Sequence, residues 1–251
     1  MALFDCLGKL CQISPKKMIL IIDEVDQAAN NQVFLDFLGQ LRDMYLERED
    51  VATFHSVILA GVYDIKNLKQ KIRPDDTHKY NSPWNIAVPF DVDMSFSIED
   101  IADMLACYEE EHLCGMNILE IATAIYEYTS GYPFLVSYLC KTLDEDKGQW
   151  NLQILQMVVK EMLQGTNTLF DDIIKNLEHY PGFRQLVEGI LLQGMEFSFV
   201  LANPDISMGA MFGILKNVNG RVQISNRIFE MYIYEYMISV NRTQNIRFGS
   251  Y

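Results

Sequence analysis

The feature that most constrains the fold is a run of five apolar residues, 18–22, that leads directly into Asp23 and Glu24. A continuous apolar run of this length is typical of a strand buried on both faces of a parallel sheet. A second such run covers 56–62, and the intervening residues at about 32–48 repeat apolar side chains at helical spacing. Strand, helix and strand in this order predict a right-handed parallel crossover. We therefore expect two parallel strands, with two carboxylates at the carboxyl end of the first.

Adjacent acids at the end of a buried strand are the pattern of the Walker B element of P-loop nucleoside triphosphatases. In such a site Asp23 holds the magnesium shell, usually through water, and Glu24 orients or deprotonates the attacking water. Open α/β sheets bind their ligands at the carboxyl ends of the strands, where these acids are expected to lie. The alternative is a buried strand that simply ends in surface acids. The helix and the second strand that follow favour the nucleotide-site interpretation.

The loop that grips the phosphates in such a site has the pattern G-x-x-x-x-G-K-[ST]. Its nearest approach is Gly8-Lys9-Leu10, where Leu3 stands in place of the first glycine and Leu10 in place of Ser or Thr. Without the loop there is no cradle of backbone N–H groups and no lysine for the phosphates. We therefore expect this chain alone to bind ATP weakly or not at all.

The composition narrows the class of protein. The 251 residues carry a formal charge of −14, which argues against nucleic acid as the main partner because phosphate binding needs clustered Lys and Arg. The five cysteines are scattered, with no C-x-x-C pair, as in a reduced protein rather than in a zinc site or a disulfide framework. No window approaches the ~20 apolar residues of a membrane span, and no signal-peptide pattern precedes the first strand. These features predict a cytoplasmic protein that does not bind a membrane.

Further elements follow from local signals along the chain. A helix is expected at about 3–12 and a third short strand at 85–92. Ser97 is expected to cap the next helix, with Glu99 and Asp100 in the first turn, where the helix dipole favours acids. That helix and those after it are predicted at about 98–112, 118–128, 133–145, 151–164, 168–178, 182–192, 206–212 and 226–239.

The C-terminal part combines these helices with a predicted hairpin. Asn219-Gly220 between 214–218 and 222–225 is a strong signal for a two-residue turn. A short strand is also expected at 196–201, and a linker at 144–149. Helices followed by a two-stranded wing predict a winged-helix-like domain.

Several segments closely resemble the bacterial AAA-ATPase-like proteins, relatives of the archaeal ATPase and STAND groups. They are residues 18–26, 30–35, 56–64, 81–87, 128–136, 211–213 and 226–230. The resemblance implies an α/β fold with an incomplete P-loop NTPase parallel sheet (the Walker B half), an all-helical lid and a C-terminal winged-helix-like domain. The implied domains are 1–93, 94–146 and 147–251.

The resemblance also implies roles for single residues and two cofactors, ATP and Mg²⁺. It makes Asp23 the metal-binding acid and Glu24 the catalytic acid. Gly131, Tyr132 and Pro133 look like the G-x-P element of STAND-type lids, which lies against the adenine. The alternative for these three residues is a helix start at Pro133, because proline suits a first helical turn.

Two further positions follow from the resemblance. Residues 61–64 fall at the sensor-1 position, where many relatives carry a small polar residue and Gly61-Val62-Tyr63 does not supply one. Arg73 is a candidate for a finger acting in trans, and a solvated loop residue is its plainer interpretation.

In P-loop ATPases of this class the strand order resembles 5-1-4-3-2, so this chain would supply strands 3, 4 and 5 and lack strands 1 and 2. Unpaired buried peptide groups are costly, which leaves three outcomes. Strands 4 and 5 could pair directly, a second copy could supply an edge, or the native protein could be longer. We prefer the third: the C-terminal portion of an AAA-like ATPase whose full-length form binds ATP-Mg, with its hydrolysis left open.

Two other functions compete with this interpretation. The first is a non-enzymatic interaction module or degenerate ATPase paralogue that binds a protein partner or a second copy of itself. The second is a DNA-binding winged helix, but the final helix offers only Arg227 against Glu230 and Glu235, which is poor chemistry for phosphates.

Overall fold

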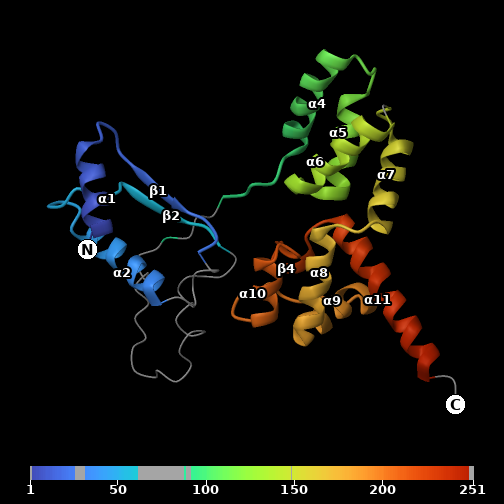
Figure 1. The fold of residues 1–251 in the computed structure, drawn as a ribbon. Helices are drawn as coiled ribbons and strands as arrows, with labels where there is room; N and C mark the ends of the chain where they lie inside the picture. Colours follow the sequence, from blue (N-terminus) through green and yellow to red (C-terminus); the bar gives the residue numbers. More distant parts are fainter. Residues whose placement is uncertain (1, 26–31, 62–87, 89–91, 148, 249–251) are drawn as a thin grey trace. The chain divides into compact units, whose positions relative to one another are not determined.

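The computed structural model describes residues 2–25, 32–61, 88, 92–147 and 149–248. The described chain is mostly helical, with one small parallel sheet and one antiparallel hairpin. It divides into two compact units, residues 1–91 and 92–251, each of which is described by itself (Figure 1). No described helix contains a stretch long and apolar enough to cross a membrane.

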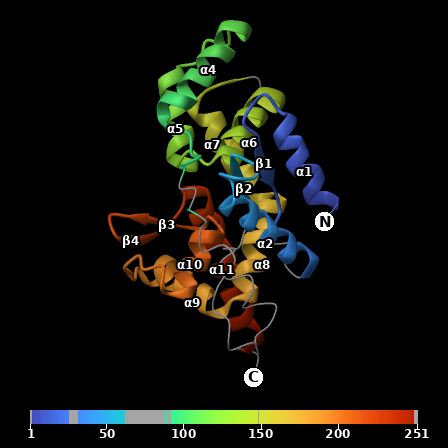
Figure 2. The same cartoon turned by 90° about the vertical axis from the view of Figure 1, so that its left-hand side faces the viewer.

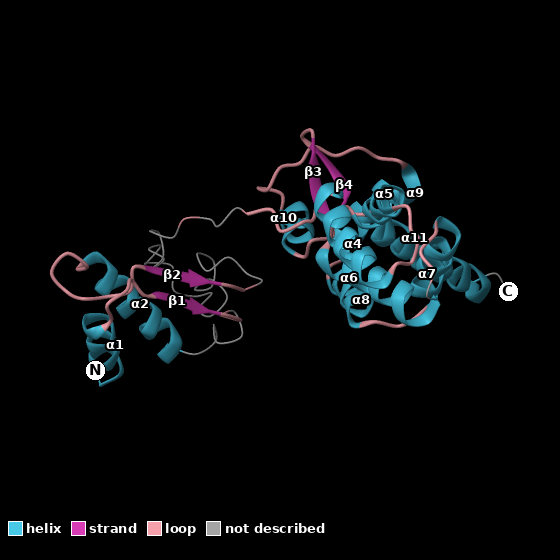
Figure 3. Ribbon diagram, turned by 90° about the horizontal axis from the view of Figure 1, so that it is seen from above, coloured by secondary structure: helices cyan, strands magenta, loops and turns pink. Residues whose placement is uncertain are grey.

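The first unit is built on a parallel pair of strands. Its elements are α1 (Ala2–Ile13), β1 (Ile19–Ile22), α2 (Gln32–Leu46) and β2 (Ser56–Leu59). β1 and β2 pair in parallel, with Ile19 opposite Ser56 and Ile22 opposite Leu59 (Figure 3). The predicted order of strand, helix and parallel strand is therefore confirmed, although β2 ends three residues earlier than expected.

The two helices that the structure describes in the first unit, α1 and α2, cover the same face of this sheet. Leu20 and Ile22 of β1 join Val57 and Leu59 of β2 in a cluster whose buried members are Leu38, Leu41 and Phe54. α1 joins the same cluster through Phe4, whose ring lies 5.3 Å from that of Phe37.

The opposite face of β1 differs from the prediction. Ile19 and Ile21 are 56% and 66% exposed, so the expectation of a strand buried on both faces is wrong for the described structure. Alternate residues of a strand point to opposite faces, and the two described helices of this unit both join the cluster on the side of Leu20 and Ile22. The third predicted strand, 85–92, lies outside the described residues except for Val88 and Val92, which are not in a strand.

The second unit begins with four helical segments. They are α4 (Ile98–His112), α5 (Ile118–Thr129), α6 (Pro133–Thr142) with its π-helical extension η2 (Leu143–Lys147), and α7 (Leu152–Gln164). The unit continues with four helices and a hairpin: α8 (Thr168–His179), α9 (Pro181–Gln193), α10 (Pro204–Met211), β3 (Leu215–Val218), β4 (Arg221–Ile224) and α11 (Arg227–Phe248) (Figure 2).

Local sequence explains where many of these helices begin. Ser97 caps α4 in a reciprocal capping box: its hydroxyl accepts from the backbone N–H of Asp100, and the Asp100 carboxylate accepts from the backbone N–H of Ser97 at 2.8 Å. Asparagine side chains cap the first turns of five other helices in the same unit. They are Asn117, Asn151, Asn167, Asn203 and Asn226.

The predicted linker at 144–149 is wrong for its first four residues. The chain after α6 stays helical as a π-helix through Lys147. Leu143 is fully buried, and the Asp144 carboxylate accepts a short hydrogen bond from the hydroxyl of Tyr108. These two tertiary contacts keep residues 143–147 helical, although their polar composition predicts a linker.

The hairpin follows its turn signal, but the strand before it does not form as predicted. Asn219 and Gly220 have φ values of 52° and 80°, the left-handed conformation that a two-residue hairpin turn requires. The predicted strand at 196–201 is reduced to an isolated bridge between Ser198 and Arg221. Its neighbour Phe199 donates a backbone hydrogen bond of 2.8 Å to Gly220.

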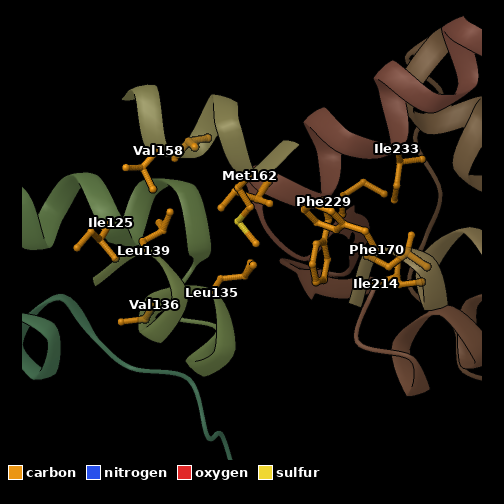
Figure 4. Packing of buried hydrophobic residues seen from close by; sticks show 14 of the residues in the cluster. Ile125, Leu135, Val136, Leu139, Val158, Met162, Phe170, Ile214, Phe229 and Ile233 are labelled. Carbon is orange, nitrogen blue, oxygen red and sulfur yellow. The ribbon is translucent and has the colours of Figure 1, made fainter. Parts of the chain in front are cut away.

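One hydrophobic cluster runs through the second unit from α4 to α11. Figure 4 shows Ile125, Leu135 and Leu139 at one end of it and Phe170 and Phe229 at the other. Phe170 stacks on Tyr232 with 3.9 Å between ring centroids. Residues on both sides of position 147 belong to this cluster, and the division into a lid (94–146) and a C-terminal domain (147–251) stays a prediction.

The capping box makes a measurable contribution to stability. We expect Ser97→Ala to lower the free energy of unfolding of the second unit by about 1 kcal/mol, because the substitution leaves the N–H of Asp100 without its side-chain acceptor. Chemical denaturation followed by Trp150 fluorescence would measure this, in a Trp84→Phe background that leaves Trp150 as the remaining tryptophan. Ser95→Ala, at an exposed position, is the control and should stay within about 0.5 kcal/mol of the parent. Equal effects of the two substitutions would contradict the capping role.

The same box predicts a pH dependence. The backbone N–H of Ser97, and then its hydroxyl, stabilise the carboxylate and hold the pKa of Asp100 below its ordinary value of 3.8. Because the folded-state pKa is depressed, the stabilisation is complete above the unfolded-state pKa and is lost as pH falls through the folded-state pKa. Carbon-13 NMR of the Asp100 carboxyl should show a depressed titration midpoint, and Ser97→Ala should raise it. A midpoint that is the same in both proteins would contradict this assignment.

Candidate functional site

Asp23 and Glu24 follow β1 directly and are both exposed. One carboxylate oxygen of Asp23 accepts a 2.8 Å hydrogen bond from the backbone N–H of Glu24. Glu24 has a φ of 53°, a left-handed conformation that is uncommon for residues other than glycine. The chain therefore turns sharply at the two acids rather than continuing the strand past them.

The residues on either side of the acids are anchored to the neighbouring strand. The carbonyl of Ile22 accepts from the N–H of Ala60 at 2.9 Å, and the N–H of Val25 donates to the carbonyl of Ala60 at 3.0 Å. The side chain of Val25 is 1% exposed, so it holds the returning chain in the core. Asp23 and Glu24 thus form a two-residue bulge at the carboxyl end of β1, beside the end of β2.

The chemistry of this bulge suits a hard divalent cation. Magnesium prefers oxygen ligands and is often held by one or two carboxylates together with water and substrate phosphates. Neither acid forms an ion pair with a described residue, so both carboxylates can accept a metal or its water shell. In the described part of the chain no group of three or more His, Cys, Asp and Glu side chains gathers as a metal cage. The donor set fits a metal that the protein holds together with phosphates.

The predicted adenine-contacting residues form a tight turn between α5 and α6. Gly131 has a φ of 74°, and a Cβ at this position would lie 1.9 Å from the carbonyl oxygen of Phe96. The carbonyl of Gly131 accepts a 2.9 Å hydrogen bond from the N–H of Phe96, one residue before the cap of α4. Two backbones therefore approach so closely that only glycine fits at this position.

Tyr132 and Pro133 also have structural roles in this turn. The ring of Tyr132 meets that of Phe229 edge-on, with 5.6 Å between centroids, and Pro133 occupies the first turn of α6. The ring contact joins the turn to α11. Pro133 begins α6, as the alternative prediction for these residues stated. The geometry explains all three residues without a ligand, and their contact with adenine stays a prediction.

The structure brings the candidate residues together in two groups. Asp23 and Glu24 lie in the first unit, whereas Gly131, Tyr132 and Pro133 lie in the second. Of the predicted sensor-1 segment only Gly61 is described, and it is exposed. The rest of that segment and Arg73 lie outside the described residues.

Sequence reasoning missed two residues of the second group. Phe96 contributes only its backbone, through the hydrogen bond to Gly131, and a contact of this kind leaves no pattern in the sequence. Lys216 on β3 donates a 3.1 Å hydrogen bond from Nζ to Oγ of Ser130, immediately before Gly131. The contact joins positions 86 residues apart, and a single lysine in a strand carries no signal of such a partner.

Comparison with protein-family models finds no match. A search of curated proteins also finds no match of significance. Among solved structures the chain is similar to a Walker-type ATPase of Pyrococcus abyssi, with a TM-score of 0.59 and 13% sequence identity. The similarity covers 92% of this chain and 66% of that one, so this chain spans less than two thirds of the length of the ATPase. At this identity the likeness shows that the two chains share a fold, and it shows nothing finer.

The close contact at Gly131 predicts a large penalty for any side chain. Gly131→Ala should destabilise the second unit by about 3–5 kcal/mol, because it adds a backbone clash to the left-handed strain. Gly115→Ala is a matched control, because Gly115 has a similar φ of 72° but open space around its Cβ position. It should cost about 1–2 kcal/mol, the strain alone. Denaturation followed by Trp150 fluorescence would compare them, and equal costs would show that the contact with Phe96 does not constrain the turn.

Proposed function

We propose that this chain is the acid-bearing part of a Walker-type ATPase of the AAA-like group. Asp23 holds Mg²⁺, largely through water, and Glu24 positions the water that attacks the terminal phosphate of ATP. The turn at Gly131, Tyr132 and Pro133 lies against the adenine. The loop that grips the phosphates comes from polypeptide outside these 251 residues.

The observation that carries this proposal is the bulge at the end of β1. Two exposed carboxylates stand side by side at the carboxyl end of a parallel strand, between two residues bonded to the neighbouring strand. Ligands of open α/β sheets bind at this edge. The likeness of the whole fold to a Walker-type ATPase supports the same interpretation.

Each acid has a separate part in the chemistry. When bound near Asp23, magnesium would neutralise charge on the phosphates. The second oxygen of Asp23, the one not bonded to the N–H of Glu24, is available to the metal's water shell. The exposed Glu24 carboxylate accepts the proton of a water and so aligns it for attack.

The missing loop sets the expected affinity of this chain by itself. Calorimetric titration with magnesium-ATP should show no binding tighter than about 1 mM, since carboxylates alone repel the phosphates when no backbone N–H cradle is present. Asp23→Asn, titrated alongside, should behave like the parent. A sub-millimolar affinity that Asp23→Asn weakens would mean that this chain completes a nucleotide site by another route, such as across a dimer.

The role of Glu24 is tested in a form that carries a phosphate loop, either a longer gene product or an assembly with the polypeptide that supplies it. There Glu24→Gln should lower the rate of ATP hydrolysis by about 100-fold or more and leave ATP binding nearly unchanged. Glu49→Gln is the matched control, because Glu49 is an exposed acid close to the amino end of β2, away from the bulge. A hydrolysis rate that neither substitution changes would refute the proposal.

A non-enzymatic interaction module is the second candidate. The half-exposed side chains of Ile19 and Ile21 favour it, because parallel sheets rarely expose an apolar face to solvent and a bound partner would cover this one. The same phosphate-loop-bearing form separates the two functions: an interaction module fails to hydrolyse ATP in the parent protein as well as in Glu24→Gln.

A further inference from the structure

Lys216 links the β-hairpin of the second unit to the end of α5. Its Nζ donates to Oγ of Ser130 at 3.1 Å, and both side chains are half-buried. Ser130 is the αL residue that ends α5, with φ of 47° and ψ of 34°. The contact therefore lies next to the turn that begins α6, and both side chains remain partly accessible.

The backbone of this turn has no donor left for a ligand. The N–H of Ser130 donates to the carbonyl of Tyr126 at 2.7 Å, and that of Tyr132 to the carbonyl of Thr129 at 3.0 Å. The N–H of Gly131 donates to Oγ1 of Thr129 at 3.1 Å. These three N–H groups are therefore not available to a ligand at Ser130, whereas side chains can supply donors.

Such donors are present on the two contacting side chains. An ammonium has three N–H donors and a serine hydroxyl has one O–H donor. Lys216 donates one of its N–H groups to Oγ of Ser130. The hydroxyl hydrogen of Ser130 is not used in this bond and can still be donated. Among the described residues no protein acceptor is bonded to the other two N–H groups or to this O–H. Three donors thus remain on one pair of side chains.

The positive charge of Lys216 has no counter-charge in the described structure. Burial lowers the pKa of Lys216, and no carboxylate opposes the effect. Three other cations of the same unit do face acids: Lys141 with Glu145, Lys175 with Asp172, and Arg221 with Glu196. A half-buried cation without an anion creates a local positive potential even in a chain of net charge −14.

We infer that Lys216 and Ser130 form a binding site for a phosphate group, with the ammonium and the hydroxyl donating to its oxygens. A phosphate monoester offers three terminal oxygens and a charge of about −1.5 to −2 near neutral pH, which matches three donors beside one uncompensated cation. A carboxylate offers only two oxygens and one charge. The site does not involve Asp23 or Glu24. It adjoins the turn that we propose to lie against the adenine, so the Tyr132 readout rests on the proposed function, whereas the pyrophosphate test does not.

The phosphate can come from a nucleotide or from a free inorganic ion. The neighbouring Tyr132 distinguishes these sources, since only a nucleotide brings a base to the turn. Pyrophosphate, ADP, adenosine and acetate are therefore the probes. Each is titrated into the full chain at low ionic strength, where screening of the lysine is least.

Backbone amide NMR of the 251-residue chain is the measurement. Pyrophosphate should shift the amides of Ser130, Gly131 and Lys216 with a dissociation constant of about 1–10 mM, in line with the weak binding of magnesium-ATP expected above. ADP should shift the same amides; an added shift at Tyr132 identifies a nucleotide as the source, and its absence identifies a free phosphate. Both results support the site.

Matched variants test the two donors separately. Lys216→Met keeps the length of the side chain but removes the charge, and should weaken pyrophosphate binding by about tenfold or more. Lys216→Arg keeps the charge and should restore most of the binding. Ser130→Ala should weaken binding less, because it removes a neutral donor. Lys175→Met removes a lysine already paired with Asp172 and should leave binding unchanged.

Three outcomes would overturn the inference. The first is no shift at Ser130, Gly131 or Lys216 with pyrophosphate or ADP. The second is an equal weakening of pyrophosphate binding by Lys216→Met and Lys175→Met, which would indicate a non-specific attraction of the anion to positive charge. The third is acetate binding as tightly as pyrophosphate. If Lys216→Met does not fold, Ser130→Ala and Lys216→Arg decide the matter. A failure here leaves the Glu24 experiment unaffected, because that experiment measures hydrolysis at β1.

Discussion

The second unit depends on the near-contact of two backbones, at Gly131 and Phe96. The end of α5, the start of α6 and the segment that leads into α4 all meet there, and a Cβ on Gly131 would lie 1.9 Å from the carbonyl oxygen of Phe96. The 2.9 Å hydrogen bond between the two residues uses polar groups that burial would otherwise leave unpaired. Around this point Tyr132 packs on Phe229 and Lys216 bonds to Ser130, so α11 and the hairpin are tied to the same turn.

The first unit has a different physical character. Among the described residues, its buried cluster of Leu38, Leu41 and Phe54 lies on the face of the β1–β2 pair that α1 and α2 cover, while Ile19 and Ile21 on the other face remain half-exposed. A two-stranded sheet with one covered face is marginal by itself, so most of its order comes from the cluster around Leu38 and Leu41. The bulge of Asp23 and Glu24 is nevertheless held on both sides, by Ile22 and by the buried Val25.

Local patterns predicted most elements of the fold because short-range physics decides them. Ser97 with Asp100 predicted the start of α4, and Asn219-Gly220 predicted the hairpin turn, since capping and turn geometry depend on neighbours within a few residues. Local patterns failed where distant partners decide the conformation. The segment after α6 stays helical because Asp144 meets Tyr108, and the expected strand around Ser198 shortens to one bridge with Arg221.

The sequence by itself determined the periodicity of the helices, the pair of apolar strands and the two acids that follow the first strand. Those features follow from side-chain chemistry and spacing along the chain. The tertiary structure alone decided which face of β1 is covered, why position 131 must be glycine, and that Lys216 meets Ser130 from 86 residues away. These depend on how close two distant backbones come, which is set by packing of the whole core and not by any local pattern.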